Sequence, residues 1–321
     1  MARQLVGKAP LLPYQHVVSN NPLQHIAEVY PYKNEQQFKN DIDTLLEYCN
    51  KQSLEKTLTE FITTGGTAKG SFILSFDDGF KEAYTTIAPM LKKKGVNAIF
   101  FINPNFIDNK KLFYRNKIST LISLLRNAEP KQLNQLSEVF NCENEFETLR
   151  NKFLAIQSET SPALITATEV LGFAEEKYLQ EHQPYLTTAQ IQQLSEQGFL
   201  FGGHSMSHPY YNRISLDEQL AETVESIEWV HRHIQQDLKL FSFPHSDAFV
   251  KGSFFQRLKD FEYRPDILFG TQNMKSETAH RMLHRFNAER PQFDFQQLVK
   301  AMALYTKLNK TLKRNTITRM P

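Results

Sequence analysis

Short apolar runs alternate with amphipathic stretches over most of the chain. The strand candidates are 70–76, 96–102, 199–201 and 240–243. Runs of this length that are largely apolar are typical of strands buried on both faces of a parallel sheet. The helix candidates are 80–94, 187–197 and 215–236, where apolar residues recur at helical spacing. Because strands and helices alternate, the pattern predicts an α/β fold.

This rhythm breaks between Asn103 and Pro184. The segment is polar, rich in Leu, Glu, Lys and Gln, and mostly helical in pattern. We expect a helical insertion over about 104–184, which either forms a wall of the functional site or packs away from it. Asn103 and the Tyr114–Arg115 pair are its candidates for contact with that site. A last helix is expected over about 293–313, within a single domain that spans 1–321.

Two adjacent carboxylates end the first of these strands, in the run Ser75-Phe76-Asp77-Asp78-Gly79. Two aspartates cannot stay in a core without compensation, so the strand must end there, at the sheet edge where α/β proteins place their sites. Successive side chains of an extended backbone point in opposite directions, so the two carboxylates can take different roles. The alternative is that one of them caps the following helix.

Two histidines follow another short apolar run, which ends in Gly202-Gly203. His204 and His208 stand four residues apart, and they share one face if the intervening turn is helical. Neutral imidazole is a common zinc ligand, although such a pair can also be incidental in a solvated loop. Taken with the aspartate pair, the histidines offer a divalent metal three ligands and leave one carboxylate as a base. This is the minimum equipment for metal-assisted hydrolysis.

The two motifs together resemble those of the polysaccharide deacetylase family, also called carbohydrate esterase family four. The family carries Thr/Ser-Phe-Asp-Asp-Gly and His-Ser/Thr-x-x-His, and both stand here intact. The resemblance implies Asp77 as the catalytic base and Asp78, His204 and His208 as the metal ligands. It also implies a distorted (β/α) barrel of seven or eight strands with its site at the carboxyl ends. Residues 12–18 resemble the first strand of that barrel.

The chain departs from the family pattern at the arginine that orients the catalytic aspartate. That position, two residues before Pro244, is Ser242 here. Some members lack this arginine and carry a later Leu-x-Arg segment, which Leu283-His284-Arg285 matches. Arg285 is therefore expected to pair with Asp77.

The general acid of the family is a histidine near the end of the barrel. His284 and His280 are both candidates, although neither stands in a clear copy of that motif. Pro244, His245 and His16 are expected to contact substrate, and the alternative for each histidine is packing against a strand end.

The resemblance implies a metal-dependent hydrolase that removes acetyl groups, chiefly N-acetyl groups, from a carbohydrate or glycan precursor. One divalent ion would hold the water that attacks. Zinc is the default on ligand grounds, and Co²⁺, Ni²⁺, Mn²⁺ or Fe²⁺ are compatible with the same donors. Two alternatives stay open: a carbohydrate-binding protein that kept the barrel and lost turnover, and a metallohydrolase for another bond.

Composition adds little to this picture. The 25 Phe and 12 Tyr suit a large core and a sugar-binding cleft, and the formal charge of +2 is close to balanced. A modest basic tail is better explained by a solvated helix end than by nucleic-acid binding; it comprises Lys307, Lys310, Lys313, Arg314 and Arg319.

The chain shows no targeting signal in its pattern. Cys49 and Cys142 have neither metal-binding spacing nor the number for a disulfide framework. Residues 1–18 lack the apolar core of a signal peptide, and no apolar span is long enough to cross a membrane. We therefore expect a cytoplasmic protein, although a chain with its leader removed would show the same pattern.

Overall fold

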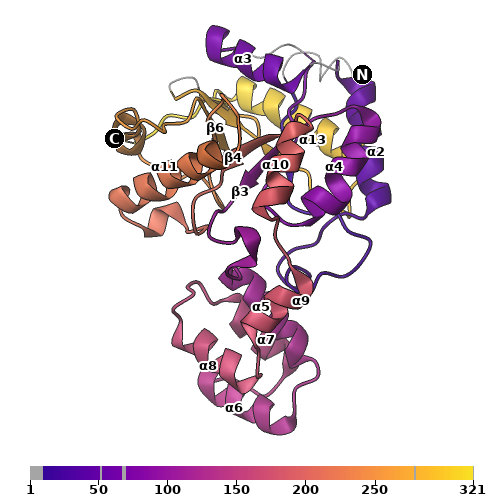
Figure 1. The fold of residues 1–321 in the computed structure, drawn as a ribbon, viewed down its shortest axis with the longest axis vertical. Coiled ribbons are helices and arrows are strands. Elements are labelled where there is room, and N and C mark those ends of the chain that lie inside the picture. The colour runs from indigo at the N-terminus through magenta and orange to yellow at the C-terminus, as the bar shows by residue number, and fades with distance from the viewer. Residues whose placement is uncertain (1–9, 51–52, 67–69, 278–279, 321) are drawn as a thin grey trace.

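The computed structural model describes residues 10–50, 53–66, 70–277 and 280–320. Within them, a nine-stranded, mostly parallel sheet curls into a distorted barrel, which confirms the predicted fold class (Figure 1). The strands are β1 (Pro13–Gln15), β2 (Ser75–Phe76), β3 (Ile99–Ile102), β4 (Leu200–Gly203), β5 (Leu240–Ser242), β6 (Ile267–Gly270), β7 (Ser276–Glu277), β8 (Met282–His284) and β9 (Phe286–Asn287). Their order in the sheet is β7-β8-β6-β5-β4-β3-β2-β1-β9, and β7 pairs antiparallel with β8.

Strands β8 and β9 join the two ends of the row of parallel strands. Only Arg285 separates them in the chain, yet β8 pairs with β6 whereas β9 pairs with β1. The N–H of Arg285 donates to the carbonyl of Gly270 at 2.8 Å, and the N–H of Phe286 donates to that of Leu12 at 3.0 Å. Residues 282–287, called the seam below, thus hold the sheet in its curled form.

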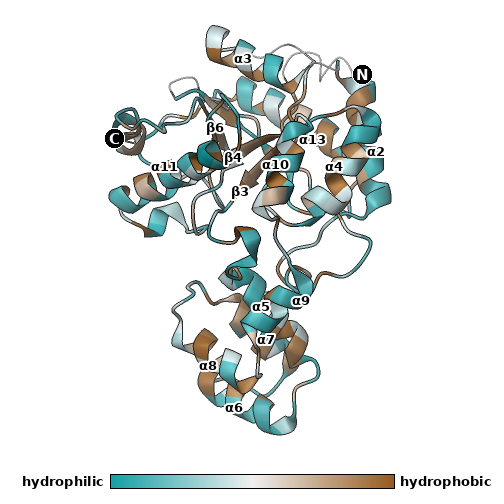
Figure 2. Cartoon of the chain, in the orientation of Figure 1, coloured by the Kyte–Doolittle hydropathy of each residue, from teal (hydrophilic) through white to brown (hydrophobic). Residues whose placement is uncertain are grey.

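The apolar runs are buried on both faces, as their composition predicts. On β3, Ile99 and Phe101 belong to the apolar cluster inside the barrel, whereas Phe100 and Ile102 pack against the surrounding helices. Helix α3 (Leu54–Thr64) covers the end of the barrel away from the insertion (Figure 1), and its Leu54, Leu58 and Phe61 belong to the apolar cluster inside the barrel. Figure 2 shows the same division, with apolar strands at the centre and polar outer faces on helices such as α11 (Leu216–His233).

The predicted helices are present with small shifts at their ends. The stretch 80–94 forms a π-helical turn over Ala83–Ile87 that continues into α4 (Ala88–Lys94). The stretch 187–197 forms α10 (Thr188–Glu196), and the last helix is α13 (Phe295–Thr311). The apolar pattern did not predict α2 (Glu35–Tyr48), α3, β6 or α12 (Gly252–Leu258).

The polar segment after Asn103 forms a helical lobe at one end of the barrel (Figure 1). Its helices are α5 (Tyr114–Leu125), α6 (Pro130–Phe140), α7 (Phe146–Leu154), α8 (Pro162–Val170) and α9 (Glu175–His182). They pack on one apolar cluster, which also includes Val17, Ile26 and Phe80 from outside the lobe. Tyr185 connects this cluster to the barrel, because its ring stacks on Phe80 and on Phe106 at centroid distances of 5.7 and 5.5 Å.

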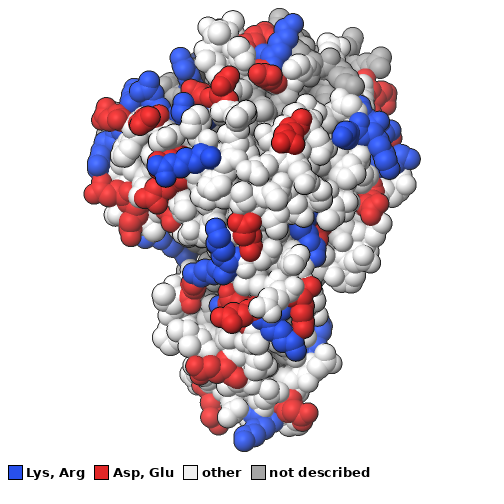
Figure 3. Space-filling model, in the orientation of Figure 1, with Lys and Arg blue, Asp and Glu red and all other residues white. Residues whose placement is uncertain are grey.

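Two further properties of the described residues bear on function. Charges of both signs are mixed over the face in Figure 3, without a large patch of one sign. Among the described helices, none combines the length and the apolar character that a membrane span requires.

Candidate active site

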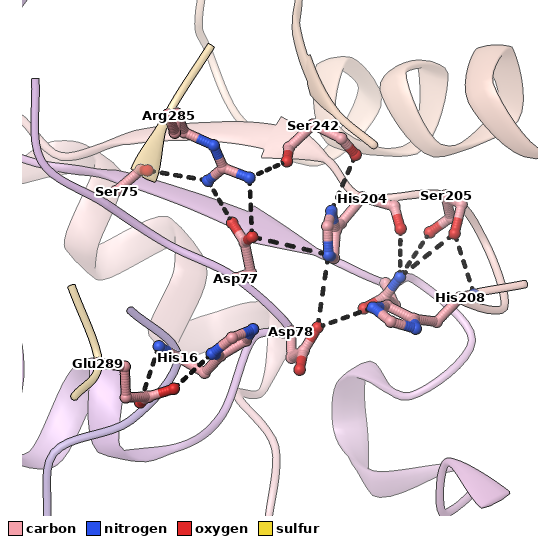
Figure 4. A network of polar contacts seen from close by, with 11 residues as sticks. His16, Ser75, Asp77, Asp78, His204, Ser205, His208, Ser242, Arg285 and Glu289 are labelled. Carbon is pink, nitrogen blue, oxygen red and sulfur yellow. Dashed lines mark hydrogen bonds and ion pairs between the residues drawn. The ribbon is translucent and has the colours of Figure 1, made fainter. Parts of the chain in front are cut away.

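Polar side chains from several parallel strands meet at one end of the barrel (Figure 4). Asp77 and Asp78 follow β2, and their carboxylates point in different directions: Asp77 toward Arg285, Asp78 toward the two imidazoles. Asp78 and Gly79 have φ values of 72° and 68°, which turn the chain sharply away from the strand. The alternative that Asp77 caps the next helix is wrong, because Arg285 occupies both of its oxygens.

Arg285 holds the Asp77 carboxylate from the seam. Its Nη1 and Nη2 donate to Oδ1 and Oδ2 at 2.7 and 2.8 Å, and the same guanidinium donates to the hydroxyls of Ser75 and Ser242. Burial alone would raise the pKa of Asp77, but Arg285 and then His204 outweigh it and lower that pKa. Ser242, which stands where many family members carry an arginine, therefore accepts a hydrogen bond from Arg285, which lies between β8 and β9.

His204 is fixed with one ring nitrogen free for a ligand. Its Nδ1 lies 2.8 Å from the carbonyl oxygen of Ser242, which can only accept a hydrogen bond, so Nδ1 carries the proton and Nε2 does not. Two glycines precede it: a Cβ on Gly203 would stand 2.3 Å from the Ser226 hydroxyl oxygen, and a Cβ on Gly202 would stand 2.6 Å from the ring of Phe101. The strand can therefore lie directly against α11.

His208 reaches His204 through a loop, not through the helical turn that the sequence suggested. Ser205 and His208 both have left-handed φ values, 67° and 60°, and the ring centroids of the two histidines are 4.9 Å apart. The Ser205 hydroxyl accepts from the His208 N–H at 2.9 Å, and Asn103 donates to the carbonyls of His204 and Ser205. Asn103 thus braces the loop that carries both histidines.

Asp78, His204 and His208 could hold a metal ion. One ligand atom from each lies within 4.8 Å of the other two, and Asp78 Oδ1 is 3.5 and 3.2 Å from the Nε2 atoms of His204 and His208. That oxygen is buried and has no hydrogen-bond partner among the described residues. Burial lowers the pKa of His204 to about 4, which keeps the imidazole in its metal-binding neutral form. One oxygen and two nitrogen donors suit zinc without excluding other divalent ions.

His16 faces this cluster and is paired with an acidic residue that the sequence analysis missed. Its Nδ1 lies 2.6 Å from Glu289 Oε2, and the N–H groups of His16 and Val17 donate to Glu289 Oε1. Burial would lower the pKa of His16, but Glu289 reverses the effect and raises the pKa to about 9. The position of Glu289, three residues past the strand-like Leu283–Phe286 run, was the only signal in the sequence.

These groups line a cavity of about 340 Å³. Asp77, Asp78, His16, His204 and His208 form its polar floor. The remaining walls come from the barrel and from the segment before α2, including Tyr14, Val29, Tyr30, Phe243, Thr271, Asn287 and Arg290. The insertion also contributes Phe113, Arg115 and Asn116, so of the two alternatives for this lobe the structure supports a wall of the site.

Two of the predicted substrate contacts differ in their placement. His245 lines the cavity, with its ring 4.4 Å from His208 and stacked on Tyr210 at 3.7 Å. Burial lowers its pKa to about 2, so this imidazole is neutral, and its Nε2 has no partner among the described residues. Pro244 is buried beside it and is not among the residues that line the cavity.

Neither candidate for the general acid lies in the cavity. His284 is fully buried, with Nε2 3.0 Å from Glu277 Oε2 and Nδ1 3.8 Å from Asp247 Oδ2. Arg319 pairs with both of those carboxylates, so the chain's own cation already neutralises this cluster. His280 stacks on Phe255 beside a separate surface pocket. Since a general acid must reach the leaving group, this geometry argues against both assignments.

If Asp77 acts as the base that the family resemblance implies, Arg285→Lys is expected to lower kcat about a hundredfold and to leave the metal content of the protein unchanged. Lysine keeps the charge but cannot donate two parallel bonds to the Asp77 carboxylate, and a small displacement of a catalytic group costs about this much. Steady-state kinetics and elemental analysis of the same preparation measure both effects. Near-normal turnover would show that Arg285 does not orient Asp77. Arg257→Lys, at an exposed arginine that pairs with Asp217, is the matched control.

The family and the fold of this site are identified by comparison with known proteins. The chain superimposes on the deacetylase PplD of Streptococcus pyogenes, solved in complex with acetate, with a TM-score of 0.58 at 14% identity, covering 92% of this chain and 98% of that one. It superimposes on IcaB of Ammonifex degensii with a TM-score of 0.53 at 13% identity, covering 92% of this chain and 98% of that one. It also superimposes on the polysaccharide deacetylase BC0361 of Bacillus cereus with a TM-score of 0.54 at 11% identity, covering 92% of this chain and 69% of that one. At these identities the structures establish the fold alone.

Sequence comparison supplies the family. No curated protein matches the chain significantly. The family model described as polysaccharide deacetylase matches residues 64–154 and 163–265, which is more than half of the chain and includes both motifs. The chain belongs to the polysaccharide deacetylase family.

Proposed function

We propose that this protein is a metal-dependent hydrolase that removes N-acetyl groups from a carbohydrate or glycan precursor. The observation that carries the proposal is the presence of two ion-paired groups, Asp77 and His16, in the cavity that holds the candidate metal ligands. Asp77 pairs with Arg285 and His16 pairs with Glu289, and both pairs lie near the Asp78–His204–His208 cluster (Figure 4). One pair is suited to accept a proton and the other to donate one.

The candidate ligands are Asp78, His204 and His208. A divalent ion bound by them would make water more acidic and would polarise the acetyl carbonyl. Asp77 would accept the proton of the attacking water while Arg285 keeps its oxygens in place. Its lowered pKa ensures that the carboxylate is ionised and ready to do so.

We assign the general acid to His16. The water oxygen forms a bond to the acetyl carbon, the carbon–nitrogen bond breaks, and the proton from His16 goes to the departing nitrogen. The products are acetate and an amine on the sugar. An amide nitrogen leaves only when it is protonated, so an acid with a pKa near 9 supports an N-acetyl substrate. A protein that only binds carbohydrate has no need of this pair of proton-transfer groups.

The proposal is tested by acetate release from N-acetylglucosamine oligomers and from O-acetylated xylan oligomers after loading with zinc, cobalt, nickel, manganese or iron in turn. Release from the N-acetylated oligomers supports it. Release from the O-acetylated oligomers alone would overturn the N-acetyl assignment. Binding of either oligomer without acetate release under any metal would favour the carbohydrate-binding alternative.

Glu289→Gln is expected to move the basic limb of the kcat/KM profile to lower pH. Glu289 raises the pKa of His16, so a neutral glutamine lets burial lower it. The active form carries the proton, is present below that pKa, and is lost as pH rises through it. The limb should therefore shift downward by a unit or more.

The pH profile of initial rates measures this shift. A limb that stays in place would show that His16 is not the acid. Glu175→Gln, at a half-buried acid that pairs with Lys117, should leave the profile unchanged.

A further inference from the structure

Helix α13 has fully buried residues only in its first half. Its buried residues are Phe295 and Val299, and none of the residues from 303 to 314 is buried. A free helix of so few turns is marginal in water, because nucleation is costly and packing supplies most of the stability. The second half of α13, where Ala303, Thr306 and Asn309 are only half-buried, is therefore held by less packing than the first half.

The second half of α13 carries an apolar stripe on its exposed side. Leu304, Leu308 and Leu312 are 61%, 58% and 51% exposed, and Tyr305 beside them is 37% exposed. Residues four apart lie above one another on a helix, so the three leucines form one continuous line on the solvent side. Single exposed leucines are ordinary, whereas an aligned set marks a surface that another body covers.

Positive charge surrounds this stripe. From residue 295 to the end of the sequence there is no Asp or Glu. The same stretch carries Lys300, Lys307, Lys310, Lys313, Arg314 and Arg319. Arg319 is buried in its pairs with Glu277 and Asp247, while the other five are exposed. Among the described residues, no ion pair occupies Lys307, Lys310 or Lys313.

We propose that residues 304–314, called the C-terminal stripe below, bind the surface of an anionic lipid bilayer. The leucines and Tyr305 would enter the boundary between headgroups and acyl chains, and the lysines would reach the headgroups. A second copy of this chain is a poor occupant, since pairing two stripes would bring the same positive charges together. In Figure 1, α13 lies on the barrel and away from the helical lobe, so this surface is separate from the cavity wall that the lobe provides.

Co-sedimentation of the full-length protein with vesicles tests the proposal. We expect binding to phosphatidylcholine vesicles that contain phosphatidylglycerol, weak binding to phosphatidylcholine alone, and a loss of binding as salt is added. Leu304→Ser with Leu308→Ser should abolish sedimentation with the vesicles. Lys307→Gln with Lys310→Gln should lower the partition coefficient roughly thirtyfold.

Matched variants at other exposed positions distinguish binding through the C-terminal stripe from non-specific adsorption to the vesicles. Ile165→Ser, at a 51% exposed residue of α8, and Lys110→Gln with Lys177→Gln should bind as the wild type does. Thermal unfolding checks that all variants are folded. Three results would overturn the proposal: no vesicle binding by the folded wild type, binding that the stripe variants retain, or leucine-dependent dimers in light scattering. None of them bears on acetate release, so the proposed activity stands or falls separately.

Discussion

Asp77→Asn is expected to lower kcat by about 10²- to 10⁴-fold while the protein retains its metal. Asparagine has nearly the same shape and can still accept one bond from Arg285, but it cannot take a proton from water. Because the candidate ligands are Asp78, His204 and His208, the exchange at Asp77 should leave the ligand set intact. Single-turnover kinetics and elemental analysis on the same preparation measure both quantities.

Stability must be separated from catalysis in that variant. Removing the Asp77 charge leaves Arg285 buried without its counter-ion, a change that can cost about 3–5 kcal/mol of unfolding free energy. Asp41→Asn is the matched control, since Asp41 is buried, pairs with Lys33 at 2.6 Å and lies outside the cavity. It should lose stability and keep turnover. If Asp77→Asn loses its metal as well, the roles of Asp77 and Asp78 are assigned the wrong way round.

His204→Ala is expected to remove the metal. The activity should fall about 10²- to 10³-fold or more as a result. Two ligands seldom hold a divalent ion that prefers four-coordinate geometry, and the ion's stabilisation of developing charge is worth several kcal/mol. Elemental analysis should find about one divalent ion per chain in the wild type and far less in the variant. Full occupancy in His204→Ala would exclude His204 from the ligand set.

A second buried histidine provides the comparison for this test. His25 is buried, contacts the Tyr178 hydroxyl through Nδ1 at 3.2 Å, and does not line the cavity. His25→Ala removes the same side chain from a comparable environment and should keep its metal. If both alanine variants lose the ion, then general destabilisation, and not a lost ligand, explains the result for His204.

The parts of the site that could be predicted are those carried by local sequence. Asp77 and Asp78 stand at the end of an apolar run, and His204 and His208 follow a glycine pair, so both motifs are visible without the fold. Arg285 was found through its Leu-x-Arg context, and the structure places it against Asp77, 208 positions away in the sequence.

What local sequence could not show depends on pairing across the barrel. Glu289 can pair with His16 only because β9 lies beside β1, and this strand pairing brings the Glu289 carboxylate to the imidazole. His284 has a suitable side chain for an acid, but the seam turns it toward Glu277 and Asp247. No spacing rule fixes which face of so short a strand meets the cavity, because a shift of one residue reverses every side chain.

Arg285 lies within the seam, near the end of the chain. This position determines how late in synthesis the Asp77–Arg285 pair can form. The ribosome releases β1 to β6, and with them both aspartates and both histidines, before residues 282–287 have left it. Until the seam docks on β1 and β6, the Asp77 carboxylate has neither its cation nor a fixed direction. A nascent chain that already contains all three candidate metal ligands therefore still lacks the Asp77–Arg285 pair, which can form only when the last parallel strand docks.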